Sequence, residues 1–545
     1  MGRWNALVVL GAAQFLMVLD ASVMNVSITQ LVEDFDTEVT AIQAVITLYS
    51  LVMAAFTITG GKLGDLWGRR RAFTVGIIVY GVGSLITATA PTLGVLTLGW
   101  SVIEGLGAAL VLPALVALVG GNYSGRDRAV AFAVIGGLAG AGIAVGPLLG
   151  GWATTALSWR VVFAGEAVVV AAIVATVRWV RDTTPVSGGG FATFDTVGAV
   201  LSALGLALVV LGILQSSSWG WLRPKNSPVE PLGFALTPFV VGAGFAVLVM
   251  FHSWERHREE TGRDPLVRFT LLEVRPLRSG LSVLAVQNVI LLGVFFIIPL
   301  YLQIVQGFDA LQTGLRLLPV SATMLLSAMS GPLLGRFTGP RRIVRMGLLV
   351  LMGASLFLVG TVEPHIDDVR FAVAMAVLGI GMGLLASQLG NVVQSAVGES
   401  SRSQVGGLQY TAQNFGSAVG TALMGAIVIS GLAAALTTRI ADDPRISEQV
   451  RAQAGVALES GVSFVSTDEV RAALANTTIP PAEADALVAG YADAQLAGLK
   501  AALLAAAGMA LVGLAFTHAL PTVPITARES EASREPALSS GAVPE

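Results

Sequence analysis

The sequence predicts an all-α, polytopic membrane protein that crosses the bilayer fourteen times. Three observations lead to this prediction. Hydrophobic residues make up 54% of the chain and charged residues only 12%, about half the share found in a soluble domain. The mean hydropathy is +0.76. Apolar runs long enough to span a bilayer follow one another along the chain, separated by short polar gaps.

The fourteen runs divide as six, two and six, because the charged segment 254–278 separates the eighth from the ninth. We therefore expect an N-terminal six-helix bundle in residues 1–181, two additional transmembrane helices in 182–254, a cytoplasmic linker in 255–279 and a C-terminal six-helix bundle in 280–520. The runs, each placed to within about four residues, are 5–29, 41–61, 72–90, 93–119, 129–153, 161–180, 195–215, 233–253, 280–304, 312–335, 343–362, 369–393, 405–434 and 498–520.

The gap Gly61–Arg71, between the second and third runs, holds an acid, turn glycines and three consecutive arginines. Short loops that keep Lys and Arg stay in the cytoplasm. With the N-terminus inside, about two thirds of the 32 Lys and Arg residues fall on the cytoplasmic side. We expect a protein of the cell membrane with both termini in the cytoplasm. A shortened copy of the gap, Gly331–Arg342, lies at the matching place in the second half, as in transporters built from two related bundles.

Two segments are predicted to lie outside the bilayer. The segment 437–496 is Ala-rich with spaced acids and arginines, and we expect one to three short helices on the outer side. They form either a simple cap or a lid over a binding site. Residues 521–545 are rich in Pro, Ser and Glu, which predicts a disordered tail.

The composition argues against an enzyme. The chain has no Cys, its four His are scattered, and neither a zinc-binding His pattern nor a phosphate-binding P-loop occurs. No nucleophile and base stand at a spacing that suggests catalysis. We therefore expect no catalytic residues, no metal site and no cofactor. The expected partners are a small-molecule substrate, protons and the lipid bilayer, with no nucleic acid, and the protein is expected to be a monomer.

The gap Gly61–Arg71 resembles the G-x-L-x-D-x-x-G-R-R signature between the second and third helices of the major facilitator superfamily. Gly61, Asp65, Gly68, Arg69 and Arg70 stand at the matching positions. A basic stop signal combined with a turn is the simpler alternative. The resemblance implies that these residues hold a cytoplasmic gate through a charge–dipole contact between the two bundles.

The fifth run contains Gly142, Gly146 and Gly150, and Pro147 follows the second of these glycines. Glycines at this spacing form a smooth face that lets another helix approach closely, and close packing alone would explain them. The pattern G-x-x-x-G-P-x-x-G-G also resembles the antiporter motif of major facilitator exporters. The resemblance implies that this helix forms the outer interface between the halves and favours exchange and export.

Three acids lie in apolar runs of the N-terminal half, where an ionisable residue is costly and marks a functional site. Asp20 belongs to Leu-Asp-x-[Ser/Thr]-x-x-Asn-Val, which resembles the first-helix signature of the fourteen-helix drug:proton antiporters. The other two depart from the family: Glu104 and Glu166 replace neutral residues, and Ser101 replaces the usual arginine. As alternatives, Glu104 faces a water-filled cavity and Glu166 pairs with Arg160. Grouped carboxyls can exchange protons or bind a cationic substrate, and both can compete for one site.

The C-terminal half supplies amides rather than acids. They can line the opposite wall of a cavity, although interhelical hydrogen bonds are the simpler use of such side chains. The candidates are Gln287, Asn288, Gln388, Asn391, Gln413 and Asn414.

The resemblance as a whole implies proton-coupled efflux of a small amphipathic or cationic compound, in the manner of multidrug exporters, by alternating access. Asp20 is the leading candidate for the proton carrier, followed by Glu104 and Glu166. One alternative is an exporter of an endogenous lipid, sugar or amino acid. Another, of a different class, is a non-transporting membrane scaffold or sensor.

Overall fold

The computed structural model describes residues 4–123, 125–182, 194–225, 227–335, 337–397, 402–451, 462–475, 477 and 479–522. All regular secondary structure in this part of the chain is helical, as predicted. Helices suit an apolar chain in lipid because they satisfy every backbone hydrogen bond within one segment. Several begin at residues that favour a helix start: Asp195 and Asp367 accept bonds from the first backbone N–H groups of their helices, and Pro276 lies in a first turn.

Residues 4–182 form the N-terminal bundle. Its elements are α1 (Asn5–Val26), α2 (Ile28–Asp34), α3 (Val39–Trp67), α4 (Arg69–Ala88), α5 (Leu93–Leu96), the π-helical η1 (Thr97–Glu104), α6 (Gly105–Asn122), α7 (Gly125–Ala156), α8 (Trp159–Thr176) and η2 (Val177–Trp179).

The rest of the described chain forms a helix pair and the C-terminal bundle. The pair and its connections comprise α9 (Thr196–Trp219), η4 (Pro231–Gly233), α10 (Thr237–Glu260) and η5 (Phe269–Glu273). The C-terminal bundle comprises α11 (Arg275–Leu300), the π-helical η6 (Tyr301–Val305), α12 (Ala310–Leu334), α13 (Pro340–Thr361), α14 (Asp368–Ser395), α15 (Arg402–Asp442), α17 (Thr467–Ala475), α18 (Pro481–Ala515) and η8 (Phe516–Ala519).

Twelve helical segments of the described chain are long and apolar enough to cross a membrane. The fifth and tenth predicted runs correspond to α7, with 32 residues, and α12, with 25, which are not among the twelve. The count of fourteen spans, and the division as six, two and six, therefore stay predictions.

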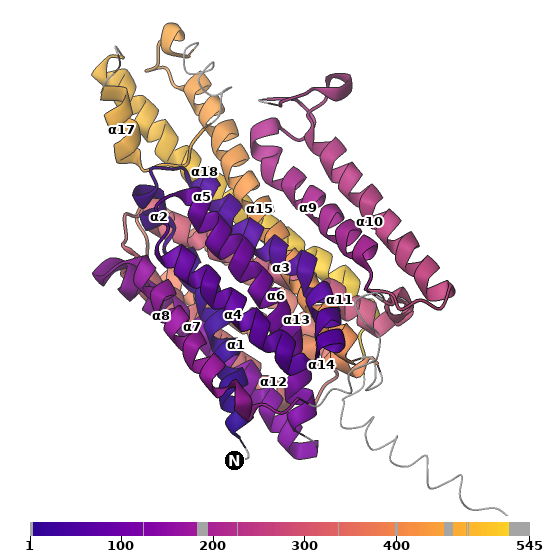
Figure 1. Cartoon of the computed structure of the whole chain (residues 1–545). Coiled ribbons are helices and arrows are strands. Elements are labelled where there is room, and N and C mark those ends of the chain that lie inside the picture. Colours follow the sequence, from indigo (N-terminus) through magenta and orange to yellow (C-terminus); the bar gives the residue numbers. More distant parts are fainter. Residues whose placement is uncertain are drawn as a thin grey trace, which may run out of the picture.

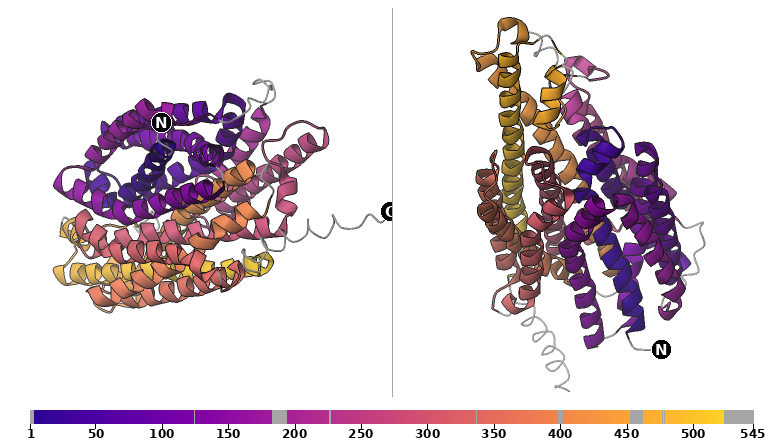
Figure 2. Two further views of the ribbon diagram at one scale, coloured as in Figure 1. Left: turned by 90° about the horizontal axis from the view of Figure 1, so that it is seen from below. Right: turned by 90° about the vertical axis from the view of Figure 1, so that its left-hand side faces the viewer.

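The two bundles lie side by side, and the views along and across the helices show this arrangement (Figure 1, Figure 2). They meet where α3 packs against α15 and α7 against α12, while α9 and α10 pack on each other and α9 also contacts α3 and α15. We call the side of the molecule that holds the start of the chain the N-terminal face. The opposite side, where α2, α17 and the start of α18 lie, is the far face (Figure 1).

Helices extend beyond the predicted membrane spans at two places. The last long helix begins at Pro481 rather than near residue 498, and α15 runs on to Asp442, so helices occupy both ends of the predicted outer segment 437–496. Alanine favours the helix there, although the spaced acids lower the hydropathy. Helices also enter the predicted linker 255–279, because α10 continues to Glu260 and α11 begins at Arg275. The predicted disordered tail lies outside the described residues after Thr522.

Candidate functional site

Three buried carboxyl groups meet inside the N-terminal bundle. Asp20 comes from α1, Glu104 from the end of η1 and Glu166 from α8, and their exposed fractions are 0%, 0% and 2%. One carboxylate oxygen from each lies within 4.8 Å of the other two. The structure thus brings together all three acids that the sequence singled out one by one. We call this group the carboxyl cluster.

Asp20 is held by an aromatic pair. The indole Nε1–H of Trp100 donates a hydrogen bond of 2.8 Å to its Oδ1. Tyr49 of α3 stacks on Trp100, with ring centroids 4.4 Å apart and an interplanar angle of 8°. This stacking fixes the indole, so its N–H stays directed at the carboxylate.

The other two acids are held by one face of α4. Thr87 donates to Glu104 Oε1 at 3.1 Å, while Ser84 and Tyr80 donate to Glu166 Oε2 at 3.2 and 3.3 Å. The three donors stand at i, i+4 and i+7, which places them on one helix face. These three donors were not predicted from the sequence. Polar residues at helical spacing inside an apolar run were the signal that could have found them.

Glycines let α4 come close enough to η1 to make these bonds. A methyl group at Gly83 would lie 2.5 Å from Glu104 Cγ and 2.7 Å from the carbonyl oxygen of Gly99. One at Gly99 would lie 2.7 Å from the Thr87 hydroxyl. No side chain fits at either position without moving a helix, so this arrangement of α4 and η1 requires both glycines.

Each acid keeps one oxygen free. Asp20 Oδ2, Glu104 Oε2 and Glu166 Oε1 are buried and have no hydrogen-bond partner within the described chain. None of the ion pairs found among the described residues involves these carboxyls. Unpaired buried oxygens are costly, and a proton or a bound positive charge at the cluster would relieve that cost.

The alternative in which Glu166 pairs with Arg160 is wrong. The guanidinium of Arg160 instead donates to Asp34 Oδ2 at 2.6 Å and to the carbonyl of Ala90 at 3.1 Å. Ser101, at the place of the family arginine, donates to the carbonyl of Val45 at 2.8 Å and so ties η1 to α3. The cluster therefore receives no guanidinium from either position.

The chemistry of the cluster follows from its donor set. Carboxylate oxygens accept protons, hydrogen bonds from organic cations, and hard metal ions. Histidine and cysteine spacing could not reveal such a set, because its three members come from helices far apart in the sequence.

The glycine stripe of α7 packs inside the N-terminal bundle. Methyl groups at Gly142 and Gly150 would lie 2.9 Å from side-chain atoms of Val18 and Val23, and Gly146 faces Ser22. All three partners lie on α1, the helix that carries Asp20.

The contact of α7 with the other bundle uses neighbouring residues. The Pro147 carbonyl faces Gly314 of α12, and Gly151 faces the Ala310 carbonyl. One face of the motif therefore contacts α1, and another face contacts α12 of the C-terminal bundle. Its role in exchange stays a prediction.

Hydrogen bonds join the bundles near the far face. Gln303 of η6 donates to the carbonyl of Val26 at 2.7 Å and accepts from the backbone N–H and the hydroxyl of Thr29, at 3.2 and 2.6 Å. We call these three bonds the Gln303 bridge. The backbone of Leu311 also donates to the hydroxyl of Thr155 at 3.2 Å.

The segment before α17 reaches across as well. Ser463 donates to Glu38 of the N-terminal bundle at 2.9 Å. The carbonyl of Ser463 accepts from the Tyr491 hydroxyl and that of Val465 accepts from Gln495, both on α18, so the segment is fixed to the C-terminal bundle.

The predicted gate residues lie at the N-terminal face. Gly68 adopts φ +94° between α3 and α4, a conformation that favours glycine, and Arg70 donates to the Val180 carbonyl at 3.4 Å. Lys62 pairs with Asp264 of the connection after α10. Gly61 packs on Pro113.

The contact between bundles that was expected here is not tested. The side chain of Asp65 lies outside the described part of the structure. Arg69 begins α4 at this same face. A gate formed by Asp65, Arg69 and Arg70 stays a prediction.

The described amides of the C-terminal bundle have different partners and different degrees of burial. Asn288 and Asn414 donate to carbonyls of their own helices. Gln287 reaches the Met382 carbonyl at 3.4 Å, and its Oε1 is buried without a partner. Gln388 is buried, Asn391 is exposed and accepts from Ser395, and Gln413 is half-buried. Their role as a cavity wall stays a prediction.

Comparison with known proteins points to transport. The sequence profile of the Major Facilitator Superfamily matches residues 10–421. A probable actinorhodin transporter of Streptomyces coelicolor is 29% identical, with 83% of this chain and 77% of the relative covered. A tetracenomycin C resistance and export protein of Streptomyces glaucescens is 26% identical, with 94% and 90% covered. A puromycin resistance protein of Streptomyces alboniger is 30% identical, with 80% and 83% covered.

Solved structures give the same fold. A bacterial homologue of the human lysosomal transporter Spinster, in an inward-facing and unoccupied conformation, superimposes with a TM-score of 0.59 at 15% identity, covering 94% of this chain and 96% of that one. The human organic anion transporter MFSD10 superimposes with a TM-score of 0.56 at 13% identity, covering 95% and 100%.

Proposed function

The chain belongs to the Major Facilitator Superfamily and is a multi-pass membrane transporter, and from this premise we propose that it exports small amphipathic cations in exchange for protons. The observation that carries the proposal is the carboxyl cluster. One oxygen of each carboxyl lies within 4.8 Å of the other two, each acid keeps one buried oxygen without a hydrogen-bond partner, and no ion pair of the described residues involves these acids.

Charge balance supports exchange at this cluster. Three carboxylates within 4.8 Å of one another, away from water, repel one another strongly when all are ionised. The cluster therefore holds either protons or a cation. A cationic substrate that binds there expels protons, and protons that bind there expel the substrate. This competition is what an antiporter requires.

The packing of α1 supports a link between the site and alternating access. Asp20 lies on the helix that packs against the glycine stripe of α7, and the Gln303 bridge binds the end of this helix to the C-terminal bundle. A rocking motion that separates the bundles at the far face would pull on α1. We propose that this motion opens the buried cluster to one side of the membrane at a time.

The names of the relatives support export as the direction and antibiotics as the substrate class. The stacked rings of Tyr49 and Trp100 beside Asp20 support an organic cation, because aromatic faces attract such ions. We further propose that both termini lie in the cytoplasm. The basic gap at the N-terminal face supports that orientation.

Transport by purified protein in liposomes tests this function. Ethidium, a fluorescent lipophilic cation, is supplied under an imposed pH gradient. We expect gradient-driven uptake by the wild type, and uptake reduced to that of empty vesicles in Asp20→Asn, Glu104→Gln and Glu166→Gln. The matched control is Glu260→Gln, which changes an acid with a 62% exposed side chain at the end of α10. Full uptake by all three cluster variants would overturn the proposal.

A further inference from the structure

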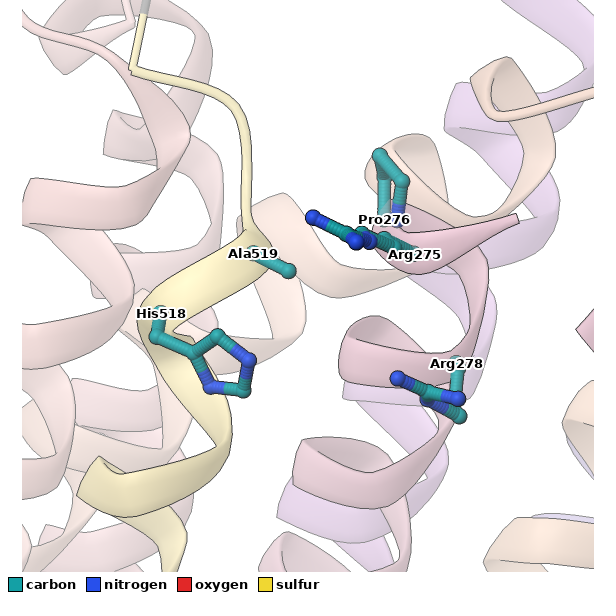
Figure 3. Close-up of a pocket in the computed structure, with 5 residues that line it drawn as sticks. All are labelled: Arg275, Pro276, Arg278, His518 and Ala519. Carbon is teal, nitrogen blue, oxygen red and sulfur yellow. The ribbon is translucent and has the colours of Figure 1, made fainter. Parts of the chain in front are cut away.

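A cationic pocket lies at the N-terminal face of the C-terminal bundle, whereas the carboxyl cluster lies in the other bundle. Its volume is about 590 Å³, and it is lined by Arg275, Pro276 and Arg278 from the start of α11 and by His518 and Ala519 from η8. The guanidinium groups of both arginines and the imidazole point into the same gap (Figure 3).

The pocket carries positive charge that the described protein does not neutralise. None of its five lining residues is acidic, and neither Arg275 nor Arg278 takes part in any ion pair of the described chain. A third guanidinium lies next to it, because Arg345 of α13 donates to the hydroxyl of Thr517 at 2.8 Å, one residue before His518. Arginines gathered without acids favour an anion with several oxygens.

The walls of the pocket are fixed rather than loose. The hydroxyl of Ser279, on α11, donates to the carbonyl of Phe516 and so holds η8 against α11. The backbone N–H of Arg341 donates to the Pro521 carbonyl at 3.0 Å, which fixes the chain after η8 to α13. The two sides of the pocket are therefore held at a defined distance.

The position of the pocket identifies the source of the anion. It lies where two apolar membrane-spanning segments end, Arg275–Val305 and Pro481–Ala519, and hence at the boundary between hydrocarbon and water. Large apolar side chains on α18 are exposed at Leu504 and Leu511, with exposed fractions of 50% and 60%. At helical spacing this exposed stripe continues through Ala515 to His518, which lines the pocket.

We propose that this pocket binds the phosphate-bearing head group of an anionic phospholipid, with the acyl chains along the exposed stripe of α18. Arg275 and Arg278 contact the phosphate oxygens, and His518 closes the site from the other side. Basic pockets between membrane helices recognise lipid head groups in this way. The proposal is independent of the transported substrate and of the carboxyl cluster.

Binding to the purified full-length chain in a neutral detergent tests the proposal. Short-chain phosphatidylglycerol, short-chain phosphatidylcholine and inorganic phosphate are titrated separately, and the midpoint of thermal unfolding is followed. We expect phosphatidylglycerol to raise the midpoint most. The double variant Arg275→Gln/Arg278→Gln should weaken its binding by about tenfold or more. The matched control Arg256→Gln/Arg268→Gln removes two exposed charges at the same face and should bind as the wild type does.

Several outcomes would overturn the proposal. One is equal binding of phosphatidylglycerol by the wild type and the pocket variant. Another is equal protection by phosphatidylcholine, or by inorganic phosphate at the same concentration, which would indicate a site for free phosphate. The acidic residues of 523–545 are the alternative occupant of the pocket, and a chain that ends at residue 522 tests for them. We expect it to bind lipid as the full chain does, and lipid binding only after this deletion would assign the pocket to the tail.

Discussion

The Gln303 bridge predicts how the far face opens. In Gln303→Ala the three hydrogen bonds to Val26 and Thr29 are lost, while the helix contact between α7 and α12 is left in place. The bonds exist only while the bundles touch at the far face. Their loss therefore penalises that state and leaves the separated state, in which water solvates the same groups, unchanged.

The size of the effect follows from the number of bonds. A hydrogen bond of this kind contributes about 1 kcal/mol net, so three contribute about 3 kcal/mol. We expect the ratio of molecules open at the far face to molecules closed there to rise by about a hundredfold, since 1.4 kcal/mol corresponds to a factor of ten. Overall thermal stability should change much less, because the substitution leaves the buried apolar side chains of both bundles in place.

The chain offers a clean assay because it contains no cysteine. Single cysteines at the exposed positions Glu33 and Val369, one in each bundle at the far face, take spin labels for distance measurement by pulsed electron paramagnetic resonance. Gln303→Ala should add or enlarge a population at longer distance.

Gln306→Ala is the matched control, since that amide also makes three hydrogen bonds, but only within the C-terminal bundle. Identical distance distributions in wild type and Gln303→Ala would show that the bridge does not hold the far face closed, as would an equal shift in Gln306→Ala.

Two further predictions concern the N-terminal bundle. Gly83→Ala should destabilise the protein by about 1–3 kcal/mol and abolish gradient-driven transport, because its methyl group would displace Glu104. The control is Gly165→Ala, whose methyl group meets no neighbour within 4 Å. It should be nearly neutral in thermal unfolding and flux assays. Partial burial works to raise the pKa of Asp34, but hydrogen bonds from the neighbouring indole and from Arg160 outweigh it and hold that pKa below its usual value of 3.8. Asp34→Asn should therefore lower the temperature of the unfolding midpoint at neutral pH, and the difference from wild type should vanish as the pH falls below 3.8. A difference that persists at low pH would contradict a stabilising ion pair between Asp34 and Arg160.

Much of the fold could be predicted because apolar runs are long and loops are short. The helix ends differ from the predicted spans where two signals conflict. Residues 481–497 form the start of α18 because alanine favours a helix, yet Glu483, Asp485 and Asp493 make the segment too polar to resemble a membrane span. Hydropathy measures burial in lipid, whereas helix formation continues beyond the bilayer.

The candidate site was predictable in its members and unpredictable in its geometry. Asp20, Glu104 and Glu166 stand out because acids are rare in apolar runs. Whether the three acids meet depends on the directions in which three helices point their side chains. For Glu104 that direction depends on the π-helical turns of η1. The hydrogen-bond donors on α4 were missed for the same reason. Ser84 and Thr87 resemble ordinary helix-packing residues until the helix that they face is known.

The most direct test of the account is a count of protons released when a substrate binds. Purified wild type in an unbuffered solution with a pH-sensitive dye receives ethidium, and ethidium binding is measured in parallel. The account predicts that protons appear in proportion to bound cation, and that Asp20→Asn/Glu104→Gln/Glu166→Gln releases none. Ethidium binding by the wild type without proton release would contradict a carboxyl cluster that exchanges protons for a cation.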